Sequence, residues 1–216
     1  MSTPVIALRN IAFAYDADRP VFCELNIELA PGQRLGLTGP NGSGKSSLLQ
    51  IIVGLLHPHA GTVEVLGAVR AAEPDFAEVR REVGLLFQDS DDQLFCPTVL
   101  EDVAFGPLNL GKTSEEAVAI ASDTLTRLGL AGFEERVTYR LSGGEKRLVA
   151  LAGVLAMQPR VLLLDEPCAG LDEDAEERLI DILAGLEQEM LVVSHNRAFL
   201  ERAATSIVTM GEVMGG

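Results

Sequence analysis

The sequence lacks the features that secreted and membrane-spanning chains need. Its longest uninterrupted apolar run, Leu148 to Met157, has ten residues, half of the ~20 that a membrane-spanning helix requires. The chain does not start with a charged segment followed by an apolar stretch, so we expect no secretory signal. Its 3 cysteines are far apart and form no C-x-x-C pattern, which favours neither a disulfide framework nor a zinc site. These absences predict a cytoplasmic protein that does not cross a bilayer by itself.

Basic residues are also scarce. The 17 Lys and Arg residues stand against 32 Asp and Glu residues, which gives a formal net charge of −15. Such a chain repels phosphate backbones, so we do not expect nucleic acid as a partner. Hydrophobic residues nevertheless make up 47% of the 216 positions, enough for the core of one domain with or without a small subdomain.

Short apolar segments predict the strands of an α/β protein. Two strand-like runs come first, at Val5–Tyr15 and Leu25–Leu29. Later apolar runs without alternation are typical of strands buried on both faces, at Val83–Phe87, Val161–Leu164 and Leu191–Val193. Helical periodicity lies between them, and the first helix is expected at Ser46–Leu56. The order indicates a parallel sheet covered by helices.

Residues 89–150 have a mainly helical pattern. The clearest helix is expected at Glu115–Leu128, with Gly129 as its stop signal. We interpret 89–150 as an inserted helical subdomain, with 1–88 and 151–216 as the core. No repeat or Gly/Ser linker separates the two parts, so they should pack together.

A glycine-rich motif follows a short apolar run that starts after Arg34, LGLTG, which is an expected strand, and precedes the expected helix at Ser46–Leu56. It matches G-x-x-x-x-G-K-[ST], the pattern of a nucleoside triphosphate-binding loop, and its residues are Gly39, Pro40, Asn41, Gly42, Ser43, Gly44, Lys45 and Ser46. Glycines let backbone amides curl around phosphate oxygens, Lys45 reaches the terminal phosphates, and the Ser46 hydroxyl can bind Mg²⁺. Ser47, the next residue, belongs to the same candidate site.

Two carboxylates end the apolar run at Val161–Leu164. In isolation, an acidic pair after a strand is typical of a solvated turn. Beside a phosphate-binding loop, however, Asp165 is expected to hold the magnesium shell, directly or through water, and Glu166 to polarise the attacking water. The sequence therefore predicts ATP and Mg²⁺ as ligands.

A third motif precedes the apolar run at Leu148–Met157. The residues Leu141-Ser142-Gly143-Gly144-Glu145 are by themselves typical of a loop and helix cap, but they resemble the signature motif of ATP-binding-cassette (ABC) ATPases, and the whole chain fits that family. The resemblance implies an α/β fold with a P-loop NTPase core built on a parallel sheet, an N-terminal antiparallel β subdomain and an inserted α-helical subdomain. It also implies that Ser142, Gly143, Gly144 and Glu145 act on ATP held by a second nucleotide-binding subunit, so that the ATPase works as a dimer.

Other positions match the motifs of this family one by one. The resemblance places Tyr15 against adenine, Gln88 in the Q-loop that senses Mg²⁺ and the transport domain, Asp172 in the D-loop, and His195 as the switch histidine. Each residue alone has an ordinary structural explanation, whereas their order and spacing support the family.

The resemblance also implies which groups react. Glu166, His195 and Lys45 are the expected catalytic residues, and Ser46, Gln88 and Asp165 the expected magnesium ligands. The chain departs from the usual family pattern at Cys168, where Thr or Ser is common, and at Asn196, where Asp is common. Neither departure removes a reacting group, so hydrolysis is expected to survive both.

A narrower resemblance is carried by FQDSDDQLFCPTVLEDVAFGPLNLG, residues 87–111, and LSGGEKRLVALAGVLAM, residues 141–157. Both are similar to ATPase subunits of energy-coupling-factor importers, especially those for nickel and cobalt. This implies a transmembrane coupling subunit that contacts the region of Asp91, Asp92 and Gln93, and a membrane subunit that binds the transported substrate. The expected location is then the cytoplasmic face of the cell membrane, as a peripheral protein.

Several alternatives stay open at this point. The cargo could instead be biotin or another vitamin, and the dimer could be a homodimer or a heterodimer. The sequence ends soon after its last expected strand, whereas many members of the family continue further, so association without nucleotide also stays open. A soluble ABC ATPase acting on DNA, ribosomes or iron–sulfur assembly is disfavoured by the acidic charge and by the 97 positions (142 minus 45) between Lys45 and Ser142, too few for a long coiled coil. A catalytically silent subunit is disfavoured because every reacting residue is present.

Overall fold

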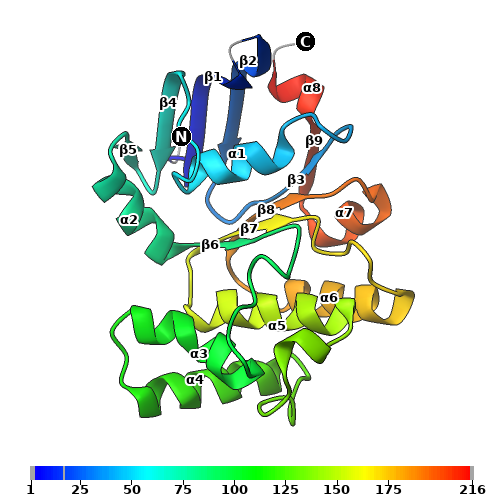
Figure 1. The fold of residues 1–216 in the computed structure, drawn as a ribbon. Helices are drawn as coiled ribbons and strands as arrows, with labels where there is room; N and C mark the ends of the chain where they lie inside the picture. Colours follow the sequence, from blue (N-terminus) through cyan, green and yellow to red (C-terminus); the bar gives the residue numbers. More distant parts are fainter. Residues whose placement is uncertain (1–2, 17, 215–216) are drawn as a thin grey trace. The chain divides into compact units, whose positions relative to one another are not determined.

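The computed structural model describes residues 3–16 and 18–214, which form two compact units (Figure 1). The first unit takes its described residues from Met1–Leu85, Arg160–Glu166 and Glu187–Gly216. The second unit consists of Leu86–Pro159 and Pro167–Leu186. The helical segment expected at residues 89–150 lies within the second unit.

An antiparallel sheet forms one layer of the first unit. Its strand order is β2 (Arg19–Leu29), β1 (Ile6–Asp16), β4 (Ala60–Val65) and β5 (Ala68–Arg70). Ile6 of β1 faces Leu29 on one side and Val65 on the other. The prediction of an N-terminal antiparallel sheet is therefore confirmed, although β2 begins well before the expected Leu25.

The second sheet of this unit contains the parallel strands. Its order is β6 (Val83–Leu86), β7 (Val161–Asp165), β8 (Glu189–Val193), β3 (Arg34–Thr38) and β9 (Ser206–Thr209). β7 and β3 both pair in parallel with β8, and β9 pairs in parallel with β3. Every residue of β7 is buried, as its uninterrupted apolar run predicts for a strand covered on both faces.

Helices α1 (Lys45–Ile52), α2 (Glu73–Glu82), α7 (Arg197–Ala203) and α8 (Met210–Val213) belong to the first unit. α1 ends earlier than the expected Leu56. Gly54, just after its C-cap, has a φ of 72° and lies against Phe76, where an added Cβ would come within 2.1 Å of the ring. The left-handed glycine terminates the helix and lets the aromatic ring pack against its end.

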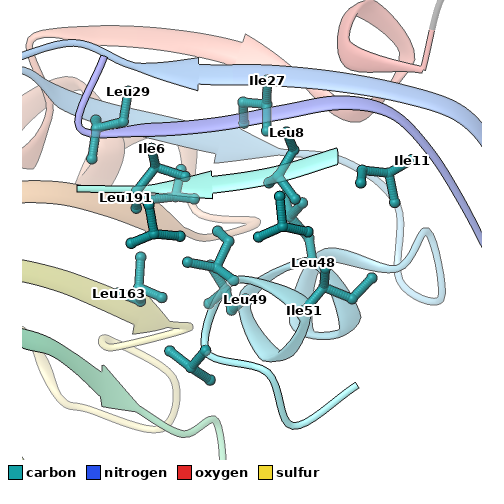
Figure 2. Close-up of a cluster of buried hydrophobic side chains, with 14 of the residues drawn as sticks. Ile6, Leu8, Ile11, Ile27, Leu29, Leu48, Leu49, Ile51, Leu163 and Leu191 are labelled. Carbon is teal, nitrogen blue, oxygen red and sulfur yellow. The ribbon is translucent and has the colours of Figure 1, made fainter. Parts of the chain in front are cut away.

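The core of the first unit holds α1 against both sheets. Figure 2 shows Leu48, Leu49 and Ile51 of α1 beside residues of the antiparallel sheet and beside Leu163 and Leu191 of the parallel sheet, all in one buried cluster. Fully burying one such side chain stabilises the fold by ~1.5–3 kcal/mol. The helix that follows the glycine-rich loop is thus fixed by its inner face, which holds its N-terminus in place.

The second unit is helical. α3 (Val99–Asn109), α4 (Ser114–Arg127) and α5 (Gly143–Ala156) pack on one another, and α6 (Glu173–Ala184) follows later in the chain. The helix expected at Glu115–Leu128 is confirmed as α4, and Gly129 follows its C-cap with a φ of 71°. No helix within the described ranges is long and apolar enough to cross a bilayer.

Residues 167–186 also belong to the second unit, although the sequence pattern alone groups them with the core. The start of α5 explains this difference. A Cβ added at Gly144 would lie 3.4 Å from a methyl carbon of Leu171 and 3.9 Å from Ala175. The segment that follows Pro167 therefore packs against the N-terminal turn of α5, a contact between residues too distant in the chain for local periodicity to indicate.

Candidate functional site

The loop between β3 and α1 has the shape of a phosphate cradle. Gly42 and Gly44 have φ values of 78° and 93°, in the left-handed region that glycine adopts without steric cost. Lys45 is buried, and its Nζ donates to the carbonyl oxygens of Gly39 and Pro40, each at 2.9 Å. Gly44 is the N-cap of α1 and has no side-chain acceptor, so the first N–H groups of the helix are available to an anion.

Gly44 is also required by packing. A Cβ added there would lie 2.5 Å from Cε1 of Phe22 and 2.5 Å from Cγ1 of Val21. Gly39 is nearly as restricted, since its Cβ would come within 2.9 Å of Met210. The antiparallel sheet and α8 thus pack closely against the loop at both glycines.

The phosphate loop and Asp165 lie at the same edge of the parallel sheet. Leu37 of β3 pairs with Val193 of β8, which in turn pairs with Asp165 of β7. Because neighbouring strands lie ~4.8 Å apart, Asp165 is about 10 Å from Leu37 across the sheet. The carboxyl ends of parallel strands are where α/β proteins bind ligands, and Asp165 is buried there with 5% exposure.

Glu166 directly follows β7 and contacts the end of β8. Its φ of 47° is left-handed, which is uncommon for a residue with a side chain. Its N–H donates to the carbonyl of Val193 at 2.9 Å, and its carboxylate accepts from Ser194 Oγ at 3.1 Å and from the N–H of His195 at 3.1 Å. The ring nitrogen Nδ1 of His195 lies 2.9 Å from the same carboxylate.

The contact with Glu166 orients the His195 ring. Nδ1 of the ring lies within hydrogen-bond distance of the carboxylate, so this contact fixes the direction in which the ring points. The ring is 64% exposed, whereas the Glu166 side chain is 7% exposed. The histidine is therefore fixed at Nδ1 while Nε2 stays accessible to another group.

Tyr15 lies beside the start of α1. Its hydroxyl is 2.9 Å from Ser47 Oγ, and its ring packs edge-to-face on Phe13 with 5.0 Å between centroids. The residue is 63% exposed in spite of these contacts. A fixed aromatic ring with an open face can stack on a planar group such as a nucleobase.

The signature segment begins α5 in the second unit. Ser142 is its N-cap: the hydroxyl accepts from the N–H of Glu145 at 3.3 Å, and Glu145 accepts the N–H of Ser142 at 2.8 Å. That N–H, together with the Ser142 hydroxyl and the Arg136 guanidinium, lowers the pKa of Glu145 below its ordinary value. Ser142 and Gly143 are exposed, and a side chain at Gly143 would meet no atom within 4 Å of its Cβ.

The other two expected residues of the second unit lie in turns. Gln88 is exposed, and its carbonyl accepts from the buried guanidinium of Arg147 at 2.6 Å, while the Phe87 carbonyl accepts from the same group at 2.7 Å. Asp172 is the N-cap of α6 and accepts the N–H of Ala175 at 2.8 Å. Within the second unit, Gln88 and Asp172 thus each have a defined position.

The family model described as ABC transporter matches residues 22–169, more than half of the chain. The chain belongs to the ABC transporter family. It is an ATPase of that family, as the glycine-rich loop and the two carboxylates at the end of β7 predict.

Two curated relatives of this ABC ATPase have names that concern transport. The cobalt import ATP-binding protein CbiO of Rhodobacter capsulatus is 43% identical over 203 residues, which is 94% of this chain and 72% of that protein. The energy-coupling factor transporter ATP-binding protein EcfA of Methanothermobacter thermautotrophicus is 39% identical over 210 residues, 95% of this chain and 68% of that protein. The narrower resemblance noted in the sequence is therefore confirmed.

Solved structures have the same fold. CbiO1 of Clostridium perfringens, part of the transporter complex CbiONQ, has a TM-score of 0.85 at 28% identity and covers 96% of this chain and 85% of its own. The ATP-binding cassette MJ0796, solved as a dimer in a post-hydrolysis state with ADP and Pi, has a TM-score of 0.86 at 26% identity and covers 94% and 93%. The predicted cassette fold is confirmed.

Sequence reasoning missed three polar residues of this ABC ATPase that hold the expected site residues or lie beside them. Ser194 donates to Glu166, Arg147 holds the carbonyls of Phe87 and Gln88, and Asp102 accepts the N–H groups of Phe95 and Cys96 at 3.1 and 2.8 Å. Ser194 had one signal, its position between a buried strand and His195. Arg147 had none, because its partners lie 60 and 59 positions away. Asp102 had none either, although its partners lie only seven and six positions earlier.

Proposed function

We propose that this ABC ATPase energises a membrane importer of the energy-coupling-factor class, with nickel or cobalt as its cargo. The ATPase part of the proposal is carried by the row of strand ends in which β3, β8 and β7 bring the phosphate loop, His195 and the pair Asp165–Glu166 to one edge. The names of the relatives CbiO and EcfA support the importer class. A biotin or vitamin importer is the alternative with the same ATPase.

The residues at this edge have the chemistry that ATP hydrolysis needs. Lys45 already lies over the loop with its ammonium held by two carbonyls, and it would exchange them for the terminal phosphates of ATP. Glu166 would accept a hydrogen bond from the attacking water, and the exposed His195 ring would donate Nε2–H to the γ-phosphate when both of its nitrogens carry protons.

Magnesium fits the donors that are present. Mg²⁺ prefers oxygen ligands, and the Ser46 hydroxyl at the start of α1 and the buried carboxylate of Asp165 are such donors at the same sheet edge. When bound, the ion would neutralise charge that develops on the phosphate oxygens. Gln88 joins these ligands as a prediction from the family motif.

The signature segment is proposed to serve a second subunit. Ser142 and Gly143 are exposed at the start of a fourteen-residue helix, and a helix N-terminus favours an anion such as the γ-phosphate. The cassette MJ0796, with the same fold, was solved as a dimer. Two copies, or this chain and a similar one, would then enclose two ATP molecules.

The membrane partner is proposed to bind a hollow of about 170 Å³ in the second unit. Phe95 and Phe105 line it with rings 4.7 Å apart, and they are 64% and 42% exposed. An aromatic pair left open in this way is typical of an interface. Because it lies directly after the segment of Asp91, Asp92 and Gln93, we assign it to the coupling segment of a transmembrane subunit, which would hold the protein at the cytoplasmic face of the membrane.

Purification of the tagged protein from its own membranes in mild detergent tests the proposal. We expect it to bring down a polytopic coupling subunit and a small substrate-binding membrane protein, identified by mass spectrometry, and the complex to hydrolyse ATP. Uptake of labelled cobalt, nickel and biotin by cells with the same subunits then names the cargo. Recovery from the soluble fraction without a membrane protein would contradict the importer and favour a soluble ABC ATPase.

A further inference from the structure

Ser194 is fixed between the strand ends that carry the reacting groups. It is fully buried, and its backbone N–H donates to the carbonyl of Leu37 in β3 at 3.1 Å. Its Oγ accepts the N–H of Asn196 at 3.1 Å. Since this donor occupies one side of the oxygen, the hydroxyl proton turns to the other side, where Glu166 Oε2 lies at 3.1 Å.

The two oxygens of the Glu166 carboxylate have different surroundings. Oε2 faces the Ser194 hydroxyl at 3.1 Å and Nδ1 of His195 at 2.9 Å. The backbone N–H of His195 is shared between the two oxygens and lies 3.3 Å from Oε2. Among the described residues, Oε1 has the His195 N–H at 3.1 Å as its donor. A carboxylate has about four acceptor positions, two on each oxygen, so Oε2 is saturated and Oε1 retains room for a water molecule.

We propose that Ser194 is a positioning residue for ATP hydrolysis, which holds Oε2 of Glu166 so that Oε1 is the oxygen that polarises the attacking water. The inference rests on the proposed role of Glu166. It explains why a hydroxyl is buried between β8 and His195, and how a glutamate with a left-handed φ keeps one orientation. Without the hydroxyl, the carboxylate loses one of the three groups that hold it by hydrogen bonds, and it can rotate about its terminal bond.

The test compares Ser194→Ala, Ser194→Thr and Ser194→Cys with wild type in steady-state ATPase assays. We expect Ser194→Ala to lower kcat about tenfold with KM for ATP within about twofold, because the lost contact orients the base rather than the nucleotide. Ser194→Thr should restore most of kcat because it keeps the hydroxyl. Ser194→Cys keeps the volume but offers a weak donor, so it should stay close to the alanine variant. If Ser194→Thr fails because its additional methyl group does not fit this buried position, Ser194→Cys still separates the loss of the hydroxyl from a change of volume.

The matched control is Ser206→Ala, which removes a hydroxyl from β9 that accepts a bond from Gln33 at 2.8 Å. It should leave kcat unchanged at a similar loss of thermal stability. Wild-type kcat in both Ser194→Ala and Ser194→Cys would overturn the inference, as would a loss in Ser194→Ala no larger than that in Ser206→Ala.

A double variant separates positioning from general damage. Single-turnover hydrolysis of labelled ATP is measured for Glu166→Gln with and without Ser194→Ala. We expect no further loss in the double variant, since Ser194 acts through the Glu166 carboxylate. A further tenfold loss would overturn the inference. If Glu166→Gln alone hydrolyses ATP near the wild-type rate, the proposed role of Glu166 fails instead, and the inference falls with it.

Discussion

At the scale of single residues, Gly44 is required for two reasons that a matched variant can separate. It combines a φ of 93° with contact to Phe22 and Val21, whereas Gly67 has a φ of 77° with no atom within 4 Å of an added Cβ. Gly67→Ala should destabilise the protein by ~1–2 kcal/mol, the cost of a left-handed alanine, and Gly44→Ala by ~1–3 kcal/mol more because of overpacking. Urea unfolding measures the difference, and equal losses would contradict the packing argument.

A second residue-scale prediction concerns Glu166. Glu166→Gln should lower kcat at least a hundredfold and leave ATP affinity within a few fold, because the amide no longer accepts a proton or polarises water as a carboxylate does. Steady-state hydrolysis and nucleotide binding check the two parts. Glu201→Gln is the matched control, an exposed glutamate in α7 that pairs with Arg197. Turnover by Glu166→Gln within about tenfold of wild type would show that another group is the main base.

At the scale of elements, capping boxes make several helices sensitive to acid. The N–H of the N-cap residue lowers the pKa of the third-position glutamate in α4, α5 and α8, which are Glu116, Glu145 and Glu212. Their folded pKa values lie below the value of 4.5 taken for an unperturbed glutamate. The stabilisation is therefore fully present above that pH and is lost as the pH falls through the folded values.

The contribution of α5 can be isolated with Glu145→Gln. The free energy of unfolding of wild type should fall more steeply between about pH 5 and pH 3 than that of the variant, because the amide cannot titrate. Urea unfolding at several pH values measures both slopes. The exposed Glu201→Gln should keep the wild-type slope, and equal slopes for Glu145→Gln and wild type would contradict the capping argument.

At the scale of the whole molecule, the proposed dimer predicts complementation between two inactive chains. Lys45→Ala removes the lysine of the phosphate loop. Gly143→Glu places a negative charge at a signature position where an added Cβ meets no atom within 4 Å, so this variant should still fold. Each variant alone should be inactive. In a mixed dimer, one site would combine an intact phosphate loop with an intact signature, so an equimolar mixture should recover about a quarter of wild-type activity if subunits exchange freely and sites act independently. ATPase assays of the mixture against each variant measure this, and no recovery would contradict independent sites shared between subunits.

The sequence alone predicted those parts of the protein whose chemistry is local. The run Gly39–Ser46 carries its phosphate-binding pattern in adjacent residues, Asp165 and Glu166 follow the buried strand that positions them, and Gly129 stops α4 as expected. Uninterrupted apolar runs also predicted the parallel-sheet strands β6, β7 and β8, because a strand buried on both faces needs apolar residues at each position, whereas β9 was not predicted. These features need few residues, and those residues are neighbours in the chain.

Only the tertiary structure decided how these groups are held. Ser194 and Glu166 are separated by 28 positions, and Arg147 and Phe87 by 60. A hydrogen bond between such residues depends on which strand ends meet and in what register, which periodicity within one segment does not specify. The sequence therefore determined which reacting groups exist, whereas the fold decided that Leu37, Val193 and Asp165 lie in one row and that Glu166 faces Ser194.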